Sequence, residues 1–343
     1  MRFLIYGDVH FSTYSSIIRS KGEKYSKRLE NLINSINWAE ELAIKNNCDE
    51  IISLGDFFDK PDLNSEELTA LTEIKWAKLP HTLIVGNHES PYKALRYNSV
   101  NALYNLGFNI ISEVSFKNID NCSILYLPYI LEEDRKNLLE YMSLNNNLKE
   151  NKIVFSHNDI KGQFGQFVSK EGFGIEDIES NCSLFLNGHL HNGNSFCKNG
   201  INLGNLTGQN FGEDAFRYSH NVYILDTDTN KLTSYENPYG FNFYQLDFKL
   251  NSKFLELNNL KNNAIVSLKC YRSDLDNLRL ALESYPNILE SRIIVKKEYS
   301  DELEEITLEK FNSIDYLNQF KVFVQSKLGV NAVIEDELNK IIK

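Results

Sequence analysis

Short apolar segments in this chain are followed directly by turns that are rich in Asp, Asn, His and Gly. The five turns are Asp8-Val9-His10, Gly55-Asp56 with Asp59, Gly86-Asn87-His88-Glu89, Ser156-His157 and Gly188-His189-Leu190-His191. Helical patterns separate several of the apolar segments, and this alternation predicts an α/β fold with right-handed crossovers between buried strands. Ligands bind at the carboxyl ends of strands in such sheets, so we expect all five turns to meet at one rim of one sheet.

Apolar spacing predicts the regular elements around these turns. The expected strands are Arg2–Tyr6, Glu50–Leu54, Thr82–Val85, Ser123–Leu127, Ile153–Phe155 and Leu184–Leu186. Apolar residues at helical spacing predict helices over Lys24–Lys45 and Glu66–Ala77, the second of them capped by Asn64 or Ser65. We therefore expect the first domain to be a layered α/β sandwich built around a mixed sheet.

The later part of the chain changes character twice. Between about residues 201 and 248 the pattern is strand-rich, and three strands are expected to be antiparallel: Val222–Leu225, Leu232–Tyr235 and Phe243–Phe248. After an Asn- and Lys-rich stretch without a clear period, the expected strand, helix and strand are Ala264–Cys270, Asp274–Glu283 and Ile288–Lys297. The expected domains are the first domain over residues 1–250, a small α/β domain over 251–300, and C-terminal helices over 301–343.

The composition excludes several classes of protein. With 42% hydrophobic and 24% charged residues, a chain of 343 residues can form about two globular domains with a large core. No apolar stretch approaches the roughly 18 residues of a membrane span, and the apolar N-terminal run is too short for a signal peptide. The five cysteines contain no Cys-x-x-Cys pair, which favours buried thiols in a reducing compartment. We therefore expect a cytoplasmic protein with no membrane partner.

The net charge is −11, from 36 basic and 47 acidic residues. A field of this sign repels nucleic acid. If the protein handles DNA, a local patch, a metal or a partner must overcome that repulsion.

The histidines are concentrated in the polar turns. Five of the seven lie there, and the other two, His81 and His220, are expected to have structural roles. Carboxylate, amide and imidazole groups without a thiolate suit manganese, iron or zinc in five- or six-coordinate sites. The set is large enough for two ions, and two ions about 3.5–4 Å apart are the usual device for hydrolysing phosphoesters.

Taken in this order, the five motifs resemble those of the calcineurin-like metallophosphoesterase superfamily over about residues 1–230. The resemblance implies a four-layer α/β/β/α sandwich with a small α/β cap domain and C-terminal helices. Within the superfamily the chain is most similar to the SbcD-type nuclease of double-strand-break repair, including its phage recombination-endonuclease versions. The residues that carry this narrower similarity are the Gly55-Asp56-Phe57-Phe58-Asp59 turn, together with the chain length and the α/β region after the core.

The resemblance also implies a role for each matching residue. The metal ligands would be Asp8, His10 and His191 for a first ion, Asn87, His157 and His189 for a second ion, and Asp56 as the bridge between them. His88 would contact the scissile phosphate and act as general acid toward the leaving oxygen. Asp59 would orient His88 and keep its proton available, with a turn-stabilising role as the alternative. The metal ions would most readily be manganese, with magnesium, iron or zinc as alternatives.

Some neighbouring residues are given smaller roles. Glu89 is expected to cap or support the turn that contains it. Asp159, two residues after His157, could support a metal ligand or be a turn residue, and the turn is favoured. The segment from Gly204 to Glu213 resembles the strand and loop after the last motif of the nucleases and is assigned no chemistry. The Gly- and Phe-rich segment over residues 161–174 could stack on an unpaired base or simply pack on its own phenylalanines.

The resemblance extends to partners and substrate. It implies a two-metal DNA exonuclease or endonuclease of recombination, repair or replication, in the cytoplasm of a bacterium or a phage-infected host. An SbcC-type ABC ATPase would supply the DNA-binding platform, with the nuclease as a homodimer within a heterotetramer. Residues 301–343 hold nine acidic and five basic side chains, so we expect them to dock the ATPase or pack on their own domain, not to bind DNA.

Other functions are compatible with parts of this pattern. A small-molecule phosphodiesterase, such as a cyclic-nucleotide or dinucleotide hydrolase, would use the same metal centre, but it does not need the region beyond residue 250. A protein phosphatase is disfavoured because Lys60-Pro61 follow Asp59 where that class has Arg-Gly. A binding protein with an inactive site is disfavoured because no ligand is missing.

Overall fold

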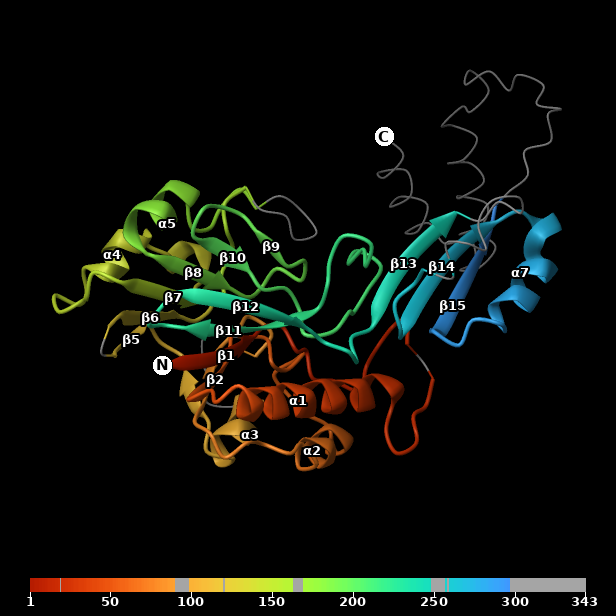
Figure 1. Cartoon of the computed structure of the whole chain (residues 1–343), viewed down its shortest axis with the longest axis horizontal. Helices are drawn as coiled ribbons and strands as arrows, with labels where there is room; N and C mark the ends of the chain where they lie inside the picture. The colour runs from red at the N-terminus through yellow and green to blue at the C-terminus, as the bar shows by residue number, and fades with distance from the viewer. Residues whose placement is uncertain are drawn as a thin grey trace, which may run out of the picture. The chain divides into compact units, whose positions relative to one another are not determined.

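The computed structural model of the chain describes residues 1–18, 20–89, 99–119, 121–162, 169–247, 257 and 259–296. The C-terminal helices predicted over residues 301–343 lie outside this part. Two six-stranded sheets and one three-stranded sheet form the framework (Figure 1). The mixed α/β architecture predicted from the sequence is confirmed.

The first sheet has the strand order β12-β11-β1-β2-β3-β4. Its strands are β1 (Arg2–Tyr6), β2 (Glu50–Ser53), β3 (His81–Ile84), β4 (Asn109–Ile111), β11 (Asn221–Asp226) and β12 (Lys231–Glu236). The neighbours from β1 to β4 are parallel, whereas β11 is antiparallel to both β1 and β12. The expected strands of this sheet are therefore found to within a residue or so at each end.

The second sheet has the order β5-β6-β7-β8-β10-β9. Its strands are β5 (Ser115–Asn118), β6 (Ser123–Leu127), β7 (Lys152–Ser156), β8 (Leu184–Asn187), β9 (Asn194–Ser195) and β10 (Gly200–Asn202). The central strands β6, β7, β8 and β10 are parallel, and the two edge pairs are antiparallel.

Alternating side chains explain why the two sheets pack face to face. In β1, Phe3 and Ile5 belong to a buried cluster shared with residues of the second sheet, such as Phe155 of β7. The alternate residues Leu4 and Tyr6 belong to a different buried cluster, which contains residues of the helices that cover the first sheet. Successive strand residues point to opposite faces, so β1 is buried on both sides. Two helical layers on the outside complete the expected four-layer α/β/β/α arrangement.

The outer helices are amphipathic and cover one sheet each. The first sheet is covered by α1 (Lys27–Lys45), α2 (Ser65–Leu71) and α3 (Val100–Asn105). The second sheet is covered by α4 (Leu138–Met142) and α5 (Ile175–Asn181). Short 3-10 turns lie at Glu132–Asp134 and Arg272–Asp274.

The helix expected over Glu66–Ala77 is shorter than predicted. It begins after Asn64, which forms a capping box with Glu67, and ends at Leu71. Beyond it the amide of Lys75 donates to Asn37 Oδ1 and the amide of Ala77 donates to Glu40 Oε2. Side chains of α1 thus take backbone donors that a continued helix would have used.

The third sheet corrects one prediction about pairing. Its strands are β13 (Asn242–Asp247), β14 (Ala264–Cys270) and β15 (Ile288–Val295), with α7 (Leu275–Leu282) between the last two. The segment Phe243–Phe248 was expected to be antiparallel with the strands before it, but β13 pairs parallel with β14. All pairs in this sheet are parallel. The strand, helix and strand expected after residue 260 are therefore present, and β13 pairs with them as a third strand.

All five cysteines are thiols that form no disulfide, and Cys48, Cys122 and Cys270 are buried, as expected. Among the helices of the described residues, none combines the length and the apolar content that a bilayer crossing requires.

Candidate metal centre

The five polar turns converge at the carboxyl ends of strands from two sheets. The turns after β1, β2 and β3 come from the first sheet, and those after β7 and β8 come from the second. The prediction of one rim of one sheet was therefore wrong in this respect, because the sandwich brings the ends of two facing sheets together. Three overlapping groups of potential metal ligands result: Asp8 with His10 and His191, His10 with Asp56 and His88, and Asp56 with His157 and His189.

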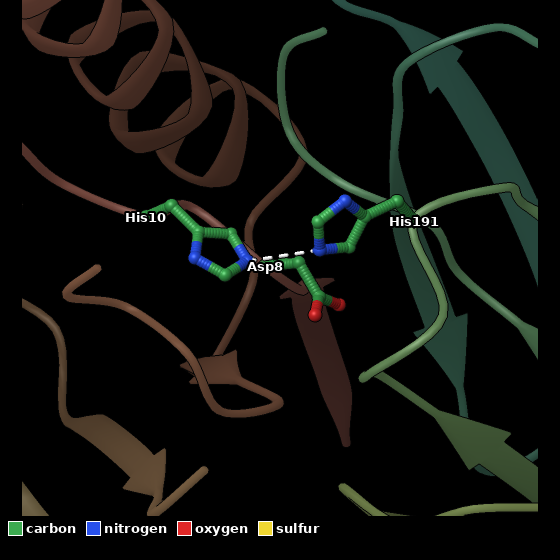
Figure 2. Close-up of side chains that lie close together, drawn as sticks. All are labelled: Asp8, His10 and His191. Carbon is green, nitrogen blue, oxygen red and sulfur yellow. Dashed lines mark hydrogen bonds between the residues drawn. The ribbon is translucent and has the colours of Figure 1, made fainter. Parts of the chain in front are cut away.

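The first group consists of Asp8, His10 and His191. Figure 2 shows the two imidazole rings pointing toward each other with the Asp8 carboxylate close by. The Nε2 atoms of His10 and His191 are 3.1 Å apart. Both oxygens of Asp8 lie 3.0 Å from the amide nitrogen of His189, which fixes the carboxylate at the start of the last motif.

The second group is centred on Asn87. Its Oδ1 atom is 3.1 Å from His157 Nε2 and 3.0 Å from His189 Nδ1. Asp56 Oδ2 is 3.1 Å from His157 Nε2 and 3.9 Å from His10 Nε2, so this carboxylate lies between the two groups. The structure thus brings together the seven residues that the resemblance implied as ligands, with Asp56 in the central position.

The outward nitrogen of each of the four imidazoles faces an oxygen that can only accept a hydrogen bond. The pairs are His10 Nδ1 with Asp59 Oδ1 (3.3 Å), His157 Nδ1 with the Leu54 carbonyl (2.6 Å), His189 Nε2 with Asp159 Oδ1 (3.2 Å) and His191 Nδ1 with Glu213 Oε1 (3.1 Å). The last three pairs are hydrogen bonds, whereas His10 Nδ1 approaches Asp59 without making one. Because the oxygens are acceptors, the outward nitrogens of His157, His189 and His191 carry the protons of the neutral rings. The inward nitrogens then present lone pairs, as metal-ligating histidines do.

The inward lone pairs provide a test of whether the residues fit metal ions. In the neutral tautomers, His10 Nε2 and His191 Nε2 would face each other with lone pairs at 3.1 Å. His157 Nε2 would likewise face the oxygens of Asn87 and Asp56, both at 3.1 Å. Such contacts repel unless a cation or a shared proton lies between them. The donor set of carboxylate, amide and imidazole therefore fits divalent ions of borderline hardness.

Burial and mutual attraction shape the charges of this centre. Burial by itself raises the pKa of Asp56, but His157 and His10 outweigh it and hold that pKa well below its usual range. Burial alone lowers the pKa of His157, yet the Asp56 and Asp8 carboxylates raise it to about 10. The buried carboxylates thus favour positive charge on the side chains beside Asp56.

Backbone conformation is unusual at several of these residues. Asp8, His10, Asp56 and His189 all have positive φ, with values of 46°, 48°, 48° and 74°. Non-glycine residues rarely occupy this region, and strain of this kind clusters at functional sites. The tight turns aim side chains from the strand ends into the centre.

Gly86 is required by close approach. A Cβ atom at Gly86 would lie 2.2 Å from Asp56 Oδ1 and 2.4 Å from the Asp56 backbone nitrogen. The glycine of the Gly-Asn-His-Glu motif therefore allows the turn after β3 to touch Asp56 in the turn after β2.

The Glu89 side chain links the turn after β2 to the turn after β3. It is fully buried and accepts hydrogen bonds from the backbone amides of Asp56 (3.2 Å), Phe58 (3.0 Å) and Gly86 (2.7 Å). Burial and the nearby Asp56 carboxylate raise the pKa of Glu89 to about 8, against the effect of its amide donors. Glu89 therefore supports the turns, as expected.

His88 lies at the edge of the centre and is partly exposed. Its Nδ1 atom is 2.8 Å from the Asp59 carbonyl oxygen and 3.8 Å from the Asp59 carboxylate. The carbonyl requires a proton on Nδ1, which leaves Nε2 as the nitrogen available to a substrate. The prediction that the carboxylate of Asp59 orients His88 needs correction, because that carboxylate lies closer to His10 and the main chain of Asp59 contacts His88.

Two carboxylates contact the histidines of the centre. For Asp159 the turn role was favoured over support of a metal ligand, but its carboxylate contacts His189. Glu213 was missed, because the Gly204–Glu213 segment was assigned no chemistry, but its carboxylate contacts His191. Glu213 lies 22 residues beyond His191 in a polar loop, and no sequence signal indicates its role.

The remaining histidines lie outside the centre, as predicted. His81 is buried and contacts the Glu40 carboxylate through Nε2 at 2.9 Å, and His220 Nδ1 lies 3.3 Å from the carbonyl of Asn205. In the segment over residues 161–174, Phe173 is buried in the cluster beneath the second sheet. Residues 163–168 lie outside the described part, so the base-stacking alternative stays a prediction.

The calcineurin-like phosphoesterase family matches residues 1–193, which is more than half of the chain, and the chain belongs to this family. Its members are metal-dependent phosphoesterases that use a centre of two metal ions. No curated protein sequence matches the chain.

Solved structures that resemble the chain are distant. TT1561 of Thermus thermophilus is 12% identical, with a TM-score of 0.40 over 68% of this chain and 98% of that chain. A dimetal phosphatase from Danio rerio is 13% identical, with a TM-score of 0.37 over 65% and 91%. A metallophosphoesterase from Sphaerobacter thermophilus is 15% identical, with a TM-score of 0.31 over 69% and 88%. Similarities this remote have no bearing on the substrate.

Proposed function

We propose that this phosphoesterase is a two-metal DNA nuclease of the SbcD type. The observation that carries the metal-dependent chemistry is the convergence of four imidazole lone pairs, two carboxylates and one amide at the rim of the sandwich. The proposed ligands are Asp8, His10 and His191 for one ion, Asn87, His157 and His189 for the other, and Asp56 between them. When bound, the two ions supply Lewis acidity, which activates water and neutralises charge on the phosphoryl oxygens.

The protein's own acid is proposed to be His88. The Asp59 carbonyl accepts the Nδ1 proton at 2.8 Å, so the proton that the imidazolium form of His88 can donate is the one on Nε2. The side chain is 39% exposed, which allows contact with a phosphodiester at the rim. In this role His88 donates its Nε2 proton to the leaving oxygen, a contribution of about 10²–10⁴-fold in rate. The centroid of its ring lies 4.7 Å from that of the His10 ring, edge-on, which places His88 beside the proposed ligands.

The choice of DNA as substrate is supported by the region after the phosphoesterase core. The third sheet with α7 adds an α/β unit that hydrolysis of a small phosphodiester does not need. The net charge of −11 disfavours tight binding of DNA by the chain alone. We therefore propose an SbcC-type ABC ATPase as the partner that binds DNA, a homodimer of the nuclease within a heterotetramer, and residues 301–343 as the docking segment. Manganese is the proposed ion, in the cytoplasm of a bacterium or a phage-infected host.

The test is a nuclease assay with manganese on linear duplex, hairpin and single-stranded DNA, with and without a cognate ATPase. We expect wild-type protein to cleave DNA, and we expect H88A to lose about 10²–10⁴-fold in rate while it still binds manganese. Loss of manganese by H88A would contradict its assignment as a residue outside the ligand set. Cleavage of bis-p-nitrophenyl phosphate without any cleavage of DNA would replace the nuclease with a small-molecule phosphodiesterase.

A further inference from the structure

We propose that Glu213 and Asp159 are positioning residues, each of which tunes one of the two metal sites. Glu213 orients His191 at the first ion, and Asp159 orients His189 at the second ion. The inference rests on the metal centre of the proposed function and does not depend on the substrate.

Glu213 is built firmly into the protein. Its Oε1 atom accepts from His191 Nδ1 at 3.1 Å and from Asn210 Nδ2 at 3.0 Å. Its Oε2 atom accepts from Asn205 Nδ2 at 2.9 Å and from the amide of Gln209 at 2.7 Å. Only 3% of the residue is exposed. Four donors therefore fix a buried carboxylate against the outward nitrogen of one proposed ligand.

Asp159 is held in a similar but more open arrangement. Its Oδ1 atom is 3.2 Å from His189 Nε2, and its Oδ2 atom is 3.3 Å from Arg135 Nη2. The Arg135 side chain is almost fully buried and also donates to the carbonyl of Ile130 at 2.8 Å. The carboxylate side chain of Asp159 is 29% exposed, so water screens its charge more than it screens that of Glu213.

A carboxylate behind an imidazole acts on the metal in two ways. It fixes the tautomer and the ring orientation, and it raises the basicity of the nitrogen that faces the ion. In the first group, His191 is hydrogen-bonded to the buried Glu213, and the Asp59 carboxylate lies 3.3 Å from His10 Nδ1 without a hydrogen bond between them. In the second group, His189 contacts the more exposed Asp159 carboxylate, and His157 donates to the Leu54 carbonyl instead of a carboxylate. The first site should therefore bind its ion more tightly than the second.

The isosteric amides separate charge and hydrogen bonding from shape. In E213Q one end of the side chain becomes an NH₂ group, which must then oppose either the His191 and Asn210 donors or the Asn205 and Gln209 donors. In D159N the expected loss of metal affinity is smaller, because the Asp159 side chain is partly exposed to water. Removing such a partner typically costs about 10–100-fold in metal affinity.

The experiment measures binding of manganese to the full chain by calorimetry, with electron paramagnetic resonance of free manganese as the second readout. We expect wild-type protein to bind two ions with unequal affinity. E213Q should weaken the tighter ion by about 10–100-fold, and D159N should weaken only the other ion, by less than that. Asp228→Asn, at a side chain 73% exposed and remote in sequence from every motif, is the matched control and should leave both affinities unchanged.

The outcomes separate this inference from the proposed function. Wild-type affinities for both ions in E213Q and D159N would overturn the positioning roles while leaving the metal centre intact. Equal weakening of both ions by each variant would overturn the assignment of one residue to each site. Absence of manganese binding by wild-type protein would overturn the metal centre itself. Two bound ions with the expected variant effects, but no cleavage of DNA, would leave this inference standing and remove the nuclease.

Discussion

Replacement of Gly86 by alanine should disable the metal centre without a change in any proposed ligand. The new Cβ atom would lie 2.4 Å from the Asp56 backbone nitrogen, whereas ordinary contact begins at 3.4 Å, so the two turns must separate by about 1 Å. Rotation of the Asp56 side chain cannot relieve this clash, because the backbone nitrogen of Asp56 remains at 2.4 Å. Overpacking of this kind costs about 1–3 kcal/mol of folding free energy.

The same displacement moves the carboxylate that lies between the two ligand groups. A misplacement of about 1 Å at a catalytic centre costs about 10²-fold in rate. We therefore expect G86A to hydrolyse bis-p-nitrophenyl phosphate about 100-fold more slowly than wild type and to bind manganese more weakly. The assays are steady-state hydrolysis, calorimetric titration with manganese, and urea denaturation.

The matched control is Gly174→Ala, at a position where a Cβ atom would meet only the Cβ atom of Asp177, at 4.0 Å. This variant should match wild type in all three assays. Wild-type hydrolysis and manganese affinity in G86A would refute the close packing of the two turns as a requirement of the centre.

Two further predictions concern parts of the fold outside the centre. His81→Ala should lower the free energy of unfolding by about 3 kcal/mol in urea denaturation, because it leaves the buried Glu40 carboxylate without its imidazole partner; unchanged manganese affinity is expected, and loss of both ions would contradict a purely structural role. Burial raises the pKa of the Cys48 thiol to about 11 and that of the Cys182 thiol to about 12, so at pH 8 only about 10⁻³ or less of each is thiolate. Ellman's reagent should therefore react far more slowly with native than with urea-unfolded protein at pH 8, and equal rates would show that the two thiols are not shielded.

The positions of the proposed ligands could be predicted from sequence because each follows a short strand with an apolar centre. Strands such as β1 and β7 are buried on both faces, and this produces short apolar runs that end at the polar turns. Local signals of this kind do not reveal which sheet a strand joins. The division of the turns between two facing sheets depends on contacts between residues far apart in the chain. Such contacts cannot be predicted from the local pattern of a single sequence.

The errors have similar physical causes. Phe243–Phe248 alternates apolar and polar residues, which resembles an antiparallel strand, but its neighbour β14 comes from a later segment and runs parallel to it. The end of α2 depends on Asn37 and Glu40, which lie on another helix. Glu213 was missed because a single carboxylate in a loop has no periodicity, and its importance arises only from the ring it touches.

The loop that contains Glu213 also contacts β13 of the third sheet. The amide of Ala215 donates to the Phe243 carbonyl at 3.0 Å, and the Phe216 ring lies edge-on to Tyr244 at 4.8 Å. The segment Glu213–Phe216 therefore contacts both β13 and the His191 ring, so a molecule that binds and displaces β13 would also displace this segment. Displacement of β13 is therefore expected to change the orientation of His191 and, with it, the affinity of the proposed metal site.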